Sequence, residues 1–184
     1  MELETNRLFI RPFQESDWSR LYDYARQTAV MHYIPGGALD KQGAKAFVRT
    51  NSGNKTKAFA VIEKHSDSLI GHIDFFDYFG GHTYEIGWVF DPKWQRRGFA
   101  TEAAQACIDE GFSNIGLHRI VATCQPENTA SWKLMETIGM RKEGFCRQCI
   151  PTRSGGWWDE YLYAILREEW AEKRLKIRGI QWKS

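Results

Sequence analysis

The sequence predicts an α/β fold of the α+β kind, in one domain whose central, mostly antiparallel sheet is flanked by helices. Its 184 residues are enough for one hydrophobic core and few for two. Hydrophobic residues make up 42% of the chain and charged residues 26%, which is ordinary globular usage. Near residue 98 the hydrophobic period changes from that of strands to that of a helix, so a block of strands precedes a helix.

The first third of the chain indicates a strand followed by two helices. Leu8 and Ile10 alternate with polar neighbours, as in a half-buried strand. Ser16 can cap the first helix, and the turn at 35–37 separates it from the second. The apolar positions are Trp18, Leu21, Tyr22 and Ala25 in the first helix and Ala44, Phe47 and Val48 in the second.

The middle of the chain predicts an antiparallel meander and then a helix. Three β-rich runs, 58–63, 69–77 and 83–90, are separated by turn-forming stretches. A helix follows over 98–112, and then a strand over 117–124. The predicted apolar stripe of the helix is Ala100, Ala104, Ile108 and Phe112.

The last third predicts a third substantial helix, two strands and a surface helix. Asn128 or Thr129 can cap the third helix, and Gly139 suits the left-handed residue that commonly follows a helix end. The remaining elements are strands over 144–150 and 157–166 and a helix with a basic face within 167–184.

Charge and hydropathy exclude several classes of protein. Twenty-five basic and 23 acidic residues give a net charge of +2, without the concentrated basic stripe of a nucleic-acid-binding protein. No apolar run approaches the roughly 20 residues that span a bilayer. Glu2 and Glu4 do not fit the basic start of a signal peptide. We therefore expect a cytoplasmic protein, monomeric or homodimeric, that binds neither nucleic acid nor membrane.

The cysteines and histidines predict no metal centre. Cys146 and Cys149 form a CxxC, but in a strand an odd separation points two side chains to opposite faces. His72, His82 and His118 have no metal-ligand spacing. We expect four reduced thiols instead of a disulfide scaffold. They are Cys107, Cys124, Cys146 and Cys149.

The most informative motif is the basic turn Gln95-Arg96-Arg97-Gly98-Phe99-Ala100, which lies between a predicted strand and a predicted helix. Free N–H groups and the dipole of a first helical turn favour an anion, and a glycine lets the backbone approach phosphate closely. Two arginines add charge suited to a pyrophosphate. Glycine-containing turns before helices also occur without any anion, so the turn alone leaves both interpretations open. The dinucleotide fingerprint GxGxxG is absent.

This turn resembles the Q/R-x-x-G-x-G/A coenzyme A motif of the GNAT (GCN5-related) N-acetyltransferase superfamily. The similarity extends from about Glu4 to Trp170 and is greatest to the RimJ/RimL-like branch. It implies the GNAT fold, with a splayed mixed sheet, over residues 1–170 and a basic amphipathic tail over 171–184. The other matching segments are Thr5 to Pro12 with Asp17, Glu85-Ile86-Gly87-Trp88, Asn128 with Ser131, and Gly139-Met140.

The resemblance implies acetyl-CoA as co-substrate, without a metal, and assigns residues to it. Backbone N–H groups from Arg97 to Thr101 would hold the pyrophosphate, and the 88–90 main chain would pair with pantetheine and polarise the thioester. Asn128 would bond pantetheine and Ser131 would lie near the departing sulfur, although both could simply serve the helix start. The assigned residues are Trp88, Val89, Phe90, Gln95, Arg96, Arg97, Gly98, Phe99, Ala100, Thr101, Asn128 and Ser131.

The proton path is less defined. An ammonium, with a pKa of about 10, must lose a proton before it attacks a carbonyl. Glu85 is the candidate base, beside Ser131 as the second catalytic candidate, but Glu85 could equally be a structural carboxylate. The resemblance implies a glutamate at the position of Ile150, as in RimL-like enzymes, or a tyrosine at that of Met135, as in the RimI-like branch, and this chain has neither. Solvent could then take the proton.

The expected reaction is acetyl transfer to a primary amine, by direct attack in a ternary complex. A protein N-terminus or a small-molecule amine would serve as acceptor. The alternative is a catalytically weak acyl-CoA-binding module with a regulatory or interaction role. Aromatic residues in strands usually belong to the hydrophobic core, and scattered carboxylates usually face solvent. Each candidate acceptor-binding residue therefore also has a purely structural interpretation. The candidate acceptor residues are Tyr33, Phe75, Asp77, Trp157 and Trp158, with Asp74, Asp159 and Glu160 as further carboxylates.

Overall fold

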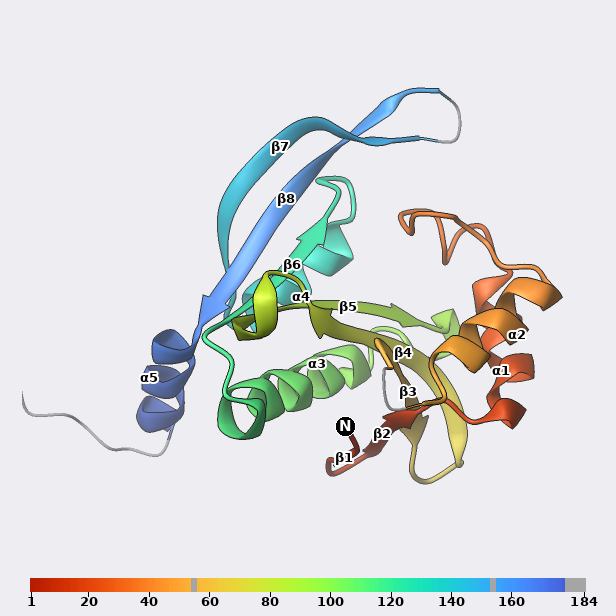
Figure 1. Cartoon of the computed structure of the whole chain (residues 1–184), viewed down its shortest axis with the longest axis horizontal. Coiled ribbons are helices and arrows are strands. Elements are labelled where there is room, and N and C mark those ends of the chain that lie inside the picture. Colours follow the sequence, from red (N-terminus) through yellow and green to blue (C-terminus); the bar gives the residue numbers. More distant parts are fainter. Residues whose placement is uncertain (54–55, 153–154, 178–184) are drawn as a thin grey trace, which may run out of the picture. The chain divides into compact units, whose positions relative to one another are not determined.

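A computed structural model describes residues 1–53, 56–152 and 155–177 of the chain (Figure 1). The fold consists of two compact units. The first unit comprises Met1–Phe76 and Ile86–Asp109, and the second comprises Asp77–Glu85 and Glu110–Ser184. Because the chain passes from one unit to the other three times, the units are not successive sequence domains. This agrees with the one-domain prediction.

The strands form a mixed sheet that is mostly antiparallel, as predicted. The strand order is β1-β2-β3-β4-β5-β6-β8-β7. Strand β5 pairs with β6 in parallel, whereas β1–β2, β2–β3, β3–β4, β6–β8 and β7–β8 are antiparallel pairs. The strands are β1 Leu3–Glu4, β2 Leu8–Pro12, β3 Ala58–Glu63, β4 Ser68–Asp77, β5 Thr83–Phe90, β6 Arg119–Cys124, β7 Arg141–Pro151 and β8 Trp157–Leu166.

The first unit carries helices α1, Trp18–Ala25, and α2, Lys41–Thr50, together with nearly all of α3, Phe99–Glu110. Asp40 caps α2 through a hydrogen bond from the Gly43 N–H. Helices α1 and α2 pack against each other (Figure 1). Burial of their apolar faces over β3 and β4 gives this unit its core. The central buried side chains include Phe13, Leu21, Tyr24, Ala25, Ala44, Val48, Ala58 and Ala60.

The second unit carries helices α4, Thr129–Thr137, and α5, Arg167–Ile177. Strands β7 and β8 form a long hairpin, and β8 also pairs with β6 (Figure 1). Gly139 follows α4 with φ 97°, the left-handed conformation that the sequence predicted there. The core of this unit lies around β6 and β8, where Ile120, Ala122 and Tyr163 are buried.

Short helical turns complete the fold and correct one predicted cap. They are η1 Glu15–Asp17, η2 Gly80–His82, η3 Pro92–Trp94 and the π-helical turn η4 Gly111–Ile115. Ser16 was expected to cap the first helix, but it lies inside η1. The Asp17 carboxylate instead accepts the Gln14 N–H at 2.7 Å and pairs with Arg11. The side chain that organises this helix start is therefore the Asp17 carboxylate, one residue after the predicted Ser16.

Two further expectations from periodicity need correction. The predicted 98–112 helix is α-helical only over α3 and then widens into η4, so Ala100 is half-buried while Phe99 and Cys107 are buried. Alternation also fails at the CxxC. The register of β7 with β8 is irregular between Cys146 and Ile150, and Gln148 has φ 48°. A bulge of this kind resets which face a side chain occupies.

No helix in the described part of the chain combines the length and apolar character needed to cross a membrane. The predicted 171–184 tail belongs in part to α5, which ends at Ile177. Residues 178–184 of that tail lie outside the described residues. The boundary between domain and tail therefore remains a prediction.

Candidate active site

The basic turn predicted from sequence lies at the start of α3, in the first unit. The Glu102 N–H bonds the Gly98 carbonyl at 3.0 Å and so begins the hydrogen-bond ladder of the helix. The N–H groups of Phe99, Ala100 and Thr101 precede that ladder and are left for another acceptor. Gly98 has φ 80° and Arg96 has φ 60°, so the turn uses two left-handed residues. Helix-start amides of this kind can bind an anion, and the anion site at this turn stays a prediction.

Gly98 owes its identity to backbone conformation more than to crowding by the protein. A Cβ built there would meet only the Arg7 Nη2 atom, at 3.4 Å. The left-handed φ is what disfavours other residues. Open space above the glycine is also what close approach of a phosphate requires.

An ion pair anchors the turn to the strand region at the N-terminus. Arg7 donates from Nε to Glu102 Oε2 at 2.7 Å and from its main-chain N–H to Glu102 Oε1 at 3.0 Å. Its Nη1 atom also donates to the Arg97 carbonyl at 3.1 Å. Thr5 adds a hydroxyl bond to Glu102 at 2.6 Å. Burial raises the pKa of Glu102, but the bonds from Thr5 and Arg7 outweigh it and leave the pKa lowered.

Aromatic rings orient the cations beside the turn. The Arg97 guanidinium lies 4.7 Å from the Trp94 ring centroid and 5.1 Å from that of Phe99. Arg7 lies 4.3 Å from the Phe99 ring. Cation–π contacts at these distances restrict where a guanidinium can point. The turn therefore presents ordered positive charge next to its free amides.

The end of β5 leads into this turn through ordered hydrogen bonds. The Asp91 N–H bonds the Ile70 carbonyl at 2.9 Å, and the Asp91 carboxylate accepts the Lys93 N–H at 3.0 Å. Gln95 donates from Nε2 to the Phe90 carbonyl at 2.9 Å. Gln95, predicted as a coenzyme A residue, thus has a positioning role between strand and turn. Of the predicted pantetheine-pairing residues, Trp88 is half-buried, whereas Val89 and Phe90 are buried.

The second unit holds the other predicted coenzyme A residues at the start of α4. The Asn128 side-chain oxygen accepts the Ser131 N–H at 3.4 Å, so Asn128 is the N-cap of α4. The Ser131 hydroxyl hydrogen-bonds the Cys124 thiol. Burial raises the pKa of Cys124 to about 11, although the Ser131 bond acts against this rise. The thiol therefore stays protonated at neutral pH.

Glu85 lies on β5 within the second unit, opposite Val121 of β6. It is half-buried, and Thr123 donates its hydroxyl to Glu85 Oε1 at 3.3 Å. A carboxylate fixed in this way could accept a proton or could serve a structural role. Both interpretations from sequence therefore stand.

The predicted acceptor residues divide between the units. In the first, Tyr33 is half-buried and packs on His32 with ring centroids 4.6 Å apart, whereas Phe75 is buried in the core. In the second, Asp77 is exposed at the end of β4. Trp157 is exposed and Trp158 half-buried at the start of β8, opposite Pro151 and Ile150.

Met135 and Ile150 occupy the two positions where the family resemblance would place an acid or base, and neither side chain can exchange a proton. Met135 is buried on α4, and Ile150 is half-buried on β7. A tyrosine is nevertheless present near α4, because the Tyr163 hydroxyl of β8 donates to Glu136 at 3.2 Å. Burial and Glu136 raise the pKa of Tyr163 to about 12.

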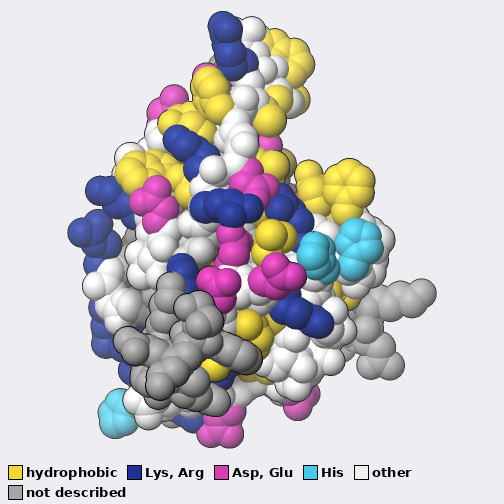
Figure 2. Space-filling view, turned by 90° about the vertical axis from the view of Figure 1, so that its left-hand side faces the viewer, with side chains coloured by type: hydrophobic (Ala, Val, Ile, Leu, Met, Phe, Trp, Pro, Cys, Tyr) yellow, Lys and Arg dark blue, Asp and Glu magenta, His cyan; other side chains and the backbone are white. Residues whose placement is uncertain are grey.

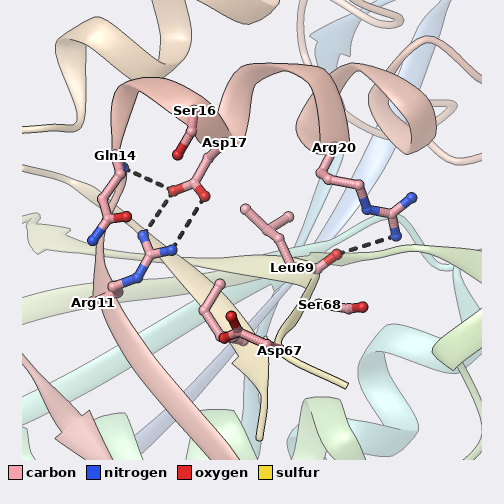
Figure 3. Close-up of a pocket in the computed structure, with 9 residues that line it drawn as sticks. Arg11, Gln14, Ser16, Asp17, Arg20, Asp67, Ser68 and Leu69 are labelled. Atoms are coloured by element: carbon pink, nitrogen blue, oxygen red, sulfur yellow. Dashed lines mark hydrogen bonds and ion pairs between the residues drawn. The ribbon is translucent and has the colours of Figure 1, made fainter. Parts of the chain in front are cut away.

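A surface pocket of about 270 Å³ in the first unit contains none of the predicted site residues (Figure 3). Arg11 and Asp17 face each other across it in a two-bond ion pair, while Arg20 points to the Leu69 carbonyl. Because Asp17 already neutralises Arg11, the pocket offers little net charge to a ligand.

Figure 2 shows interspersed Lys, Arg, Asp and Glu side chains on the face it draws, with hydrophobic groups towards the β7–β8 hairpin at the top. Phe145 and Trp157 of the hairpin are 52% and 58% exposed.

Among the described residues, no group of three or more His, Cys, Asp or Glu side chains could hold a metal ion.

Sequence reasoning missed the residues that support the turn. Arg7 and Glu102 are 95 positions apart, so no local pattern could link them. Cys124 was noted only as a reduced thiol, although it is the partner of Ser131. Tyr24 was omitted from the core of α1, although it is fully buried and bonds His72 Nδ1 at 2.9 Å.

Comparison with known proteins gives consistent matches along the chain. Residues 7–141 match a family model described as the acetyltransferase (GNAT) domain. A Bacillus subtilis (strain 168) protein, called the uncharacterized N-acetyltransferase YnaD, is 54% identical over 92% of this chain and 99% of its own length. The [ribosomal protein uS5]-alanine N-acetyltransferase of Escherichia coli (strain K12) is 27% identical over 95% of each chain.

A solved structure supports the same assignment. The crystal structure of a GNAT-family acetyltransferase from Bacillus anthracis superposes with a TM-score of 0.88 at 50% identity. The match covers 91% of this chain and 99% of that one. The strand order and the helix after the basic turn thus have a counterpart in a known acetyltransferase.

Proposed function

Since the chain belongs to the GNAT acetyltransferase family, whose members use acetyl-CoA, we propose that it transfers the acetyl group to a primary amine in a ternary complex. The observation that carries the proposal is the start of α3. There Gly98, with φ 80°, precedes three amides that are not part of the helical ladder. Arg96 and Arg97 supply the charge for a pyrophosphate.

The donor-binding role follows from the chemistry of these groups. Helix N-terminal amides and a positive dipole end stabilise phosphate oxygens. Main-chain groups of Trp88 to Phe90 would bind the pantetheine arm as an added strand and polarise the thioester carbonyl. In the second unit, the Asn128 side-chain oxygen already accepts the Ser131 N–H. Its amide NH2 group would therefore donate the hydrogen bond to pantetheine.

The reaction needs a neutral amine nucleophile and the removal of one proton from its nitrogen as the amide forms. The neutral amine nitrogen attacks the thioester carbonyl carbon, the C–S bond breaks, and the thiolate of coenzyme A leaves. Glu85, or solvent, takes the proton that the amine loses. Ser131 would donate a hydrogen bond to the departing sulfur, for which its hydroxyl must turn away from the Cys124 sulfur to which it now donates. Orientation of the two substrates would supply much of the rate.

For the acceptor we propose an aliphatic amine, either a protein N-terminus or a small molecule. The name of the Escherichia coli relative specifies an alanine of ribosomal protein uS5. At 27% identity that specificity is a hypothesis for this chain, and with it the RimJ/RimL-like assignment. The same fold carries many acceptors, because the donor site is better fixed than the acceptor site.

The decisive experiment has two steps. A melting curve with acetyl-CoA at about 100 times its dissociation constant should show about 2.7 kcal/mol of added stability. Release of free thiol is then followed over a panel of an alanine-initiated peptide, a polyamine and an alkylamine. Donor binding with no turnover on any amine would favour a binding module with a regulatory or interaction role instead. No melting shift at millimolar acetyl-CoA would contradict both.

A further inference from the structure

Strand β4 of the first unit carries a carboxylate that the donor site does not use. Asp74 lies opposite Ala58 of β3, and His72 lies opposite Ala60, so both side chains share one face of the sheet. That face is the one covered by α1 and α2, because Ala58 and Ala60 belong to the core beneath those helices. An acidic side chain on a core-facing position needs an explanation.

The immediate neighbours of Asp74 leave space around its carboxylate. On one side stands Ala58, with only a methyl group. On the other side stands Gly87 of β5, where an added Cβ would lie 3.4 Å from Asp74 Oδ2. Gly87 directly precedes Trp88, the first residue of the strand segment proposed to bind the thioester. The carboxylate thus borders the stretch of β5 where acetyl transfer is proposed to occur.

In the part of the chain that the structure describes, no positive charge balances this carboxylate. Within residues 1–53, 56–152 and 155–177, Asp74 has no ion-pair or hydrogen-bond partner, whereas Asp17 pairs with Arg11 and Asp91 lies 3.7 Å from Arg20. Burial raises the pKa of Asp74, and the nearby His72 only partly opposes the rise. Asp74 is half-buried, and an unpaired carboxylate with restricted access to water is costly unless a cation completes the site.

His72 is held in a form that cannot supply that cation. Its Nδ1 atom is 2.9 Å from the Tyr24 hydroxyl oxygen. The ring centroids of Phe13 and Phe47 lie 6.2 and 5.2 Å from the centroid of the imidazole ring. Burial lowers the pKa of His72, so the imidazole is neutral at pH 7. Tyr24 is fully buried, and burial raises its pKa well above the ordinary value. The pair Tyr24–His72 is therefore a neutral, rigid wall beside Asp74.

We propose that Asp74 is the subsite for the cationic amine of the acceptor, with Gly87 as its open edge and the Tyr24–His72 pair as its neutral wall. The inference rests on the proposed acetyltransferase function and specifies its substrate class. The acceptor is an amine that arrives protonated, and an uncharged or aromatic amine is disfavoured. The Asp74 carboxylate holds the ammonium, which loses one proton to solvent before the neutral amine attacks.

Two variants test this subsite by different routes. Asp74→Asn removes the charge while preserving shape, and Gly87→Ala preserves the charge but narrows the open edge. Loss of a hydrogen bond between charged groups costs roughly 1.5–3 kcal/mol, which corresponds to a rise of about 10- to 100-fold in the KM of a cationic amine. The KM of acetyl-CoA should stay within about twofold of the parent. The acceptors are 1,4-diaminobutane and an alanine-initiated hexapeptide.

Matched controls exist for both variants. Asp23→Asn removes an exposed aspartate of α1. Gly43→Ala places a methyl 3.3 Å from the Asp40 carboxylate, a contact like that at Gly87 but in α2. Both controls should leave the amine KM unchanged. A parental amine KM in Asp74→Asn and Gly87→Ala would overturn the subsite while the acetyltransferase function stands.

A binding measurement keeps the two proposals separable. Calorimetric titration of 1,4-diaminobutane into the complex with coenzyme A reports amine affinity without turnover. If the parent transfers no acetyl group, the proposed function fails, and the titration still decides the subsite. Affinity that falls at least tenfold in Asp74→Asn supports it. Equal affinity in parent and variant, or no amine binding by either, overturns it.

Discussion

The guanidinium of Arg7 and the carboxylate of Glu102 join the N-terminal strand region to the first turn of α3, with Nε and Oε2 2.7 Å apart. The same guanidinium reaches the Arg97 carbonyl inside the basic turn. One side chain thus fixes both the helix start and the turn that precedes it. The donor site proposed here depends on this support, although Arg7 belongs to neither element.

Arg7→Ala should therefore lower affinity for acetyl-CoA by about tenfold, because the Arg97 carbonyl and the turn lose their anchor. The cost in stability should be only about 1 kcal/mol, since Arg7 is partly exposed. That corresponds to a fall of roughly 2–4 °C in melting temperature for a chain of this size. Melting curves with and without acetyl-CoA measure both quantities. Arg141→Ala, which removes ion pairs to Glu143 and Glu169, is the control and should leave donor affinity intact.

Gly98→Ala should destabilise the protein by about 1–2 kcal/mol, the cost of a left-handed conformation for a residue with a Cβ. Gly116 offers a close match, with φ 83° and an arginine Nη2 atom 3.5 Å from a built Cβ. Both alanine variants should lower the melting temperature similarly, but only Gly98→Ala should also weaken acetyl-CoA binding. Equal donor affinities in the two variants would remove Gly98 from the donor site. Gly98→Leu should abolish the melting shift that acetyl-CoA produces.

Local signals in the sequence were enough to predict most elements of the fold. The limits of β3, β5 and β8 follow from apolar runs bounded by turn residues, and Gly139 marks the end of α4 as expected. Prediction failed at the start of α1 and within β7. Asp17 organises the start of α1 because it pairs with Arg11, and the bulge at Gln148 breaks the alternation of β7. The capping box between Gln14 and Asp17 is a local signal that the prediction overlooked, whereas the bulge has no evident short-range signature.

The site shows the same division. The turn at Gly98 was predictable because its chemistry resides in consecutive residues. The environment of Asp74 was not, since it depends on Ala58 and Gly87 from neighbouring strands and on His72 being neutral. From sequence, Asp74 was one of several acidic residues without distinction. Its neighbours on other strands, and not its own sequence context, distinguish this half-buried carboxylate from the other acidic residues.

Glu85→Gln should reduce kcat by about 100-fold if Glu85 is the general base, the lower part of the range for such catalysis. Donor affinity should remain near the parental value. The amide can still accept the Thr123 hydroxyl bond, so the local structure should persist. Glu143→Gln removes the ion pairs of Glu143 with Arg119 and Arg141. This variant serves as the comparison for a purely structural carboxylate. Equal kcat values in the two variants would return Glu85 to a structural role and leave proton removal to solvent.

Thiol labelling should separate the four cysteines into two classes. Cys146 and Cys149 are exposed, whereas Cys107 and Cys124 are buried. Iodoacetamide at pH 7.5 should modify the folded protein at the two exposed thiols only, because thiolates react and Cys124 has a pKa of about 11. Partial desolvation, Glu160 and Cys146 raise the pKa of the exposed Cys149, so its modification should be slow. Peptide mapping by mass spectrometry identifies the sites, and modification of Cys124 before unfolding would contradict its packing against Ser131.

Asp74 and Glu102 should affect stability in opposite directions as pH changes. The pKa of Asp74 is raised in the folded state. Its contribution to the free energy of unfolding is therefore favourable at acidic pH, below the pKa of the unfolded chain, and is lost as the pH rises through the folded-state pKa. Asp74→Asn should therefore melt at a higher temperature than the parent at pH 7, a gain in stability accompanied by weaker amine binding. The difference should shrink as the pH approaches 4. Glu102, whose pKa is lowered, contributes above its unfolded pKa and loses that contribution as pH falls, so Glu102→Gln should melt below the parent at pH 7 and converge with it in acid. Melting curves of the three proteins between pH 4 and 8 test both signs, and a destabilised Asp74→Asn at pH 7 would show that the carboxylate has a stabilising partner.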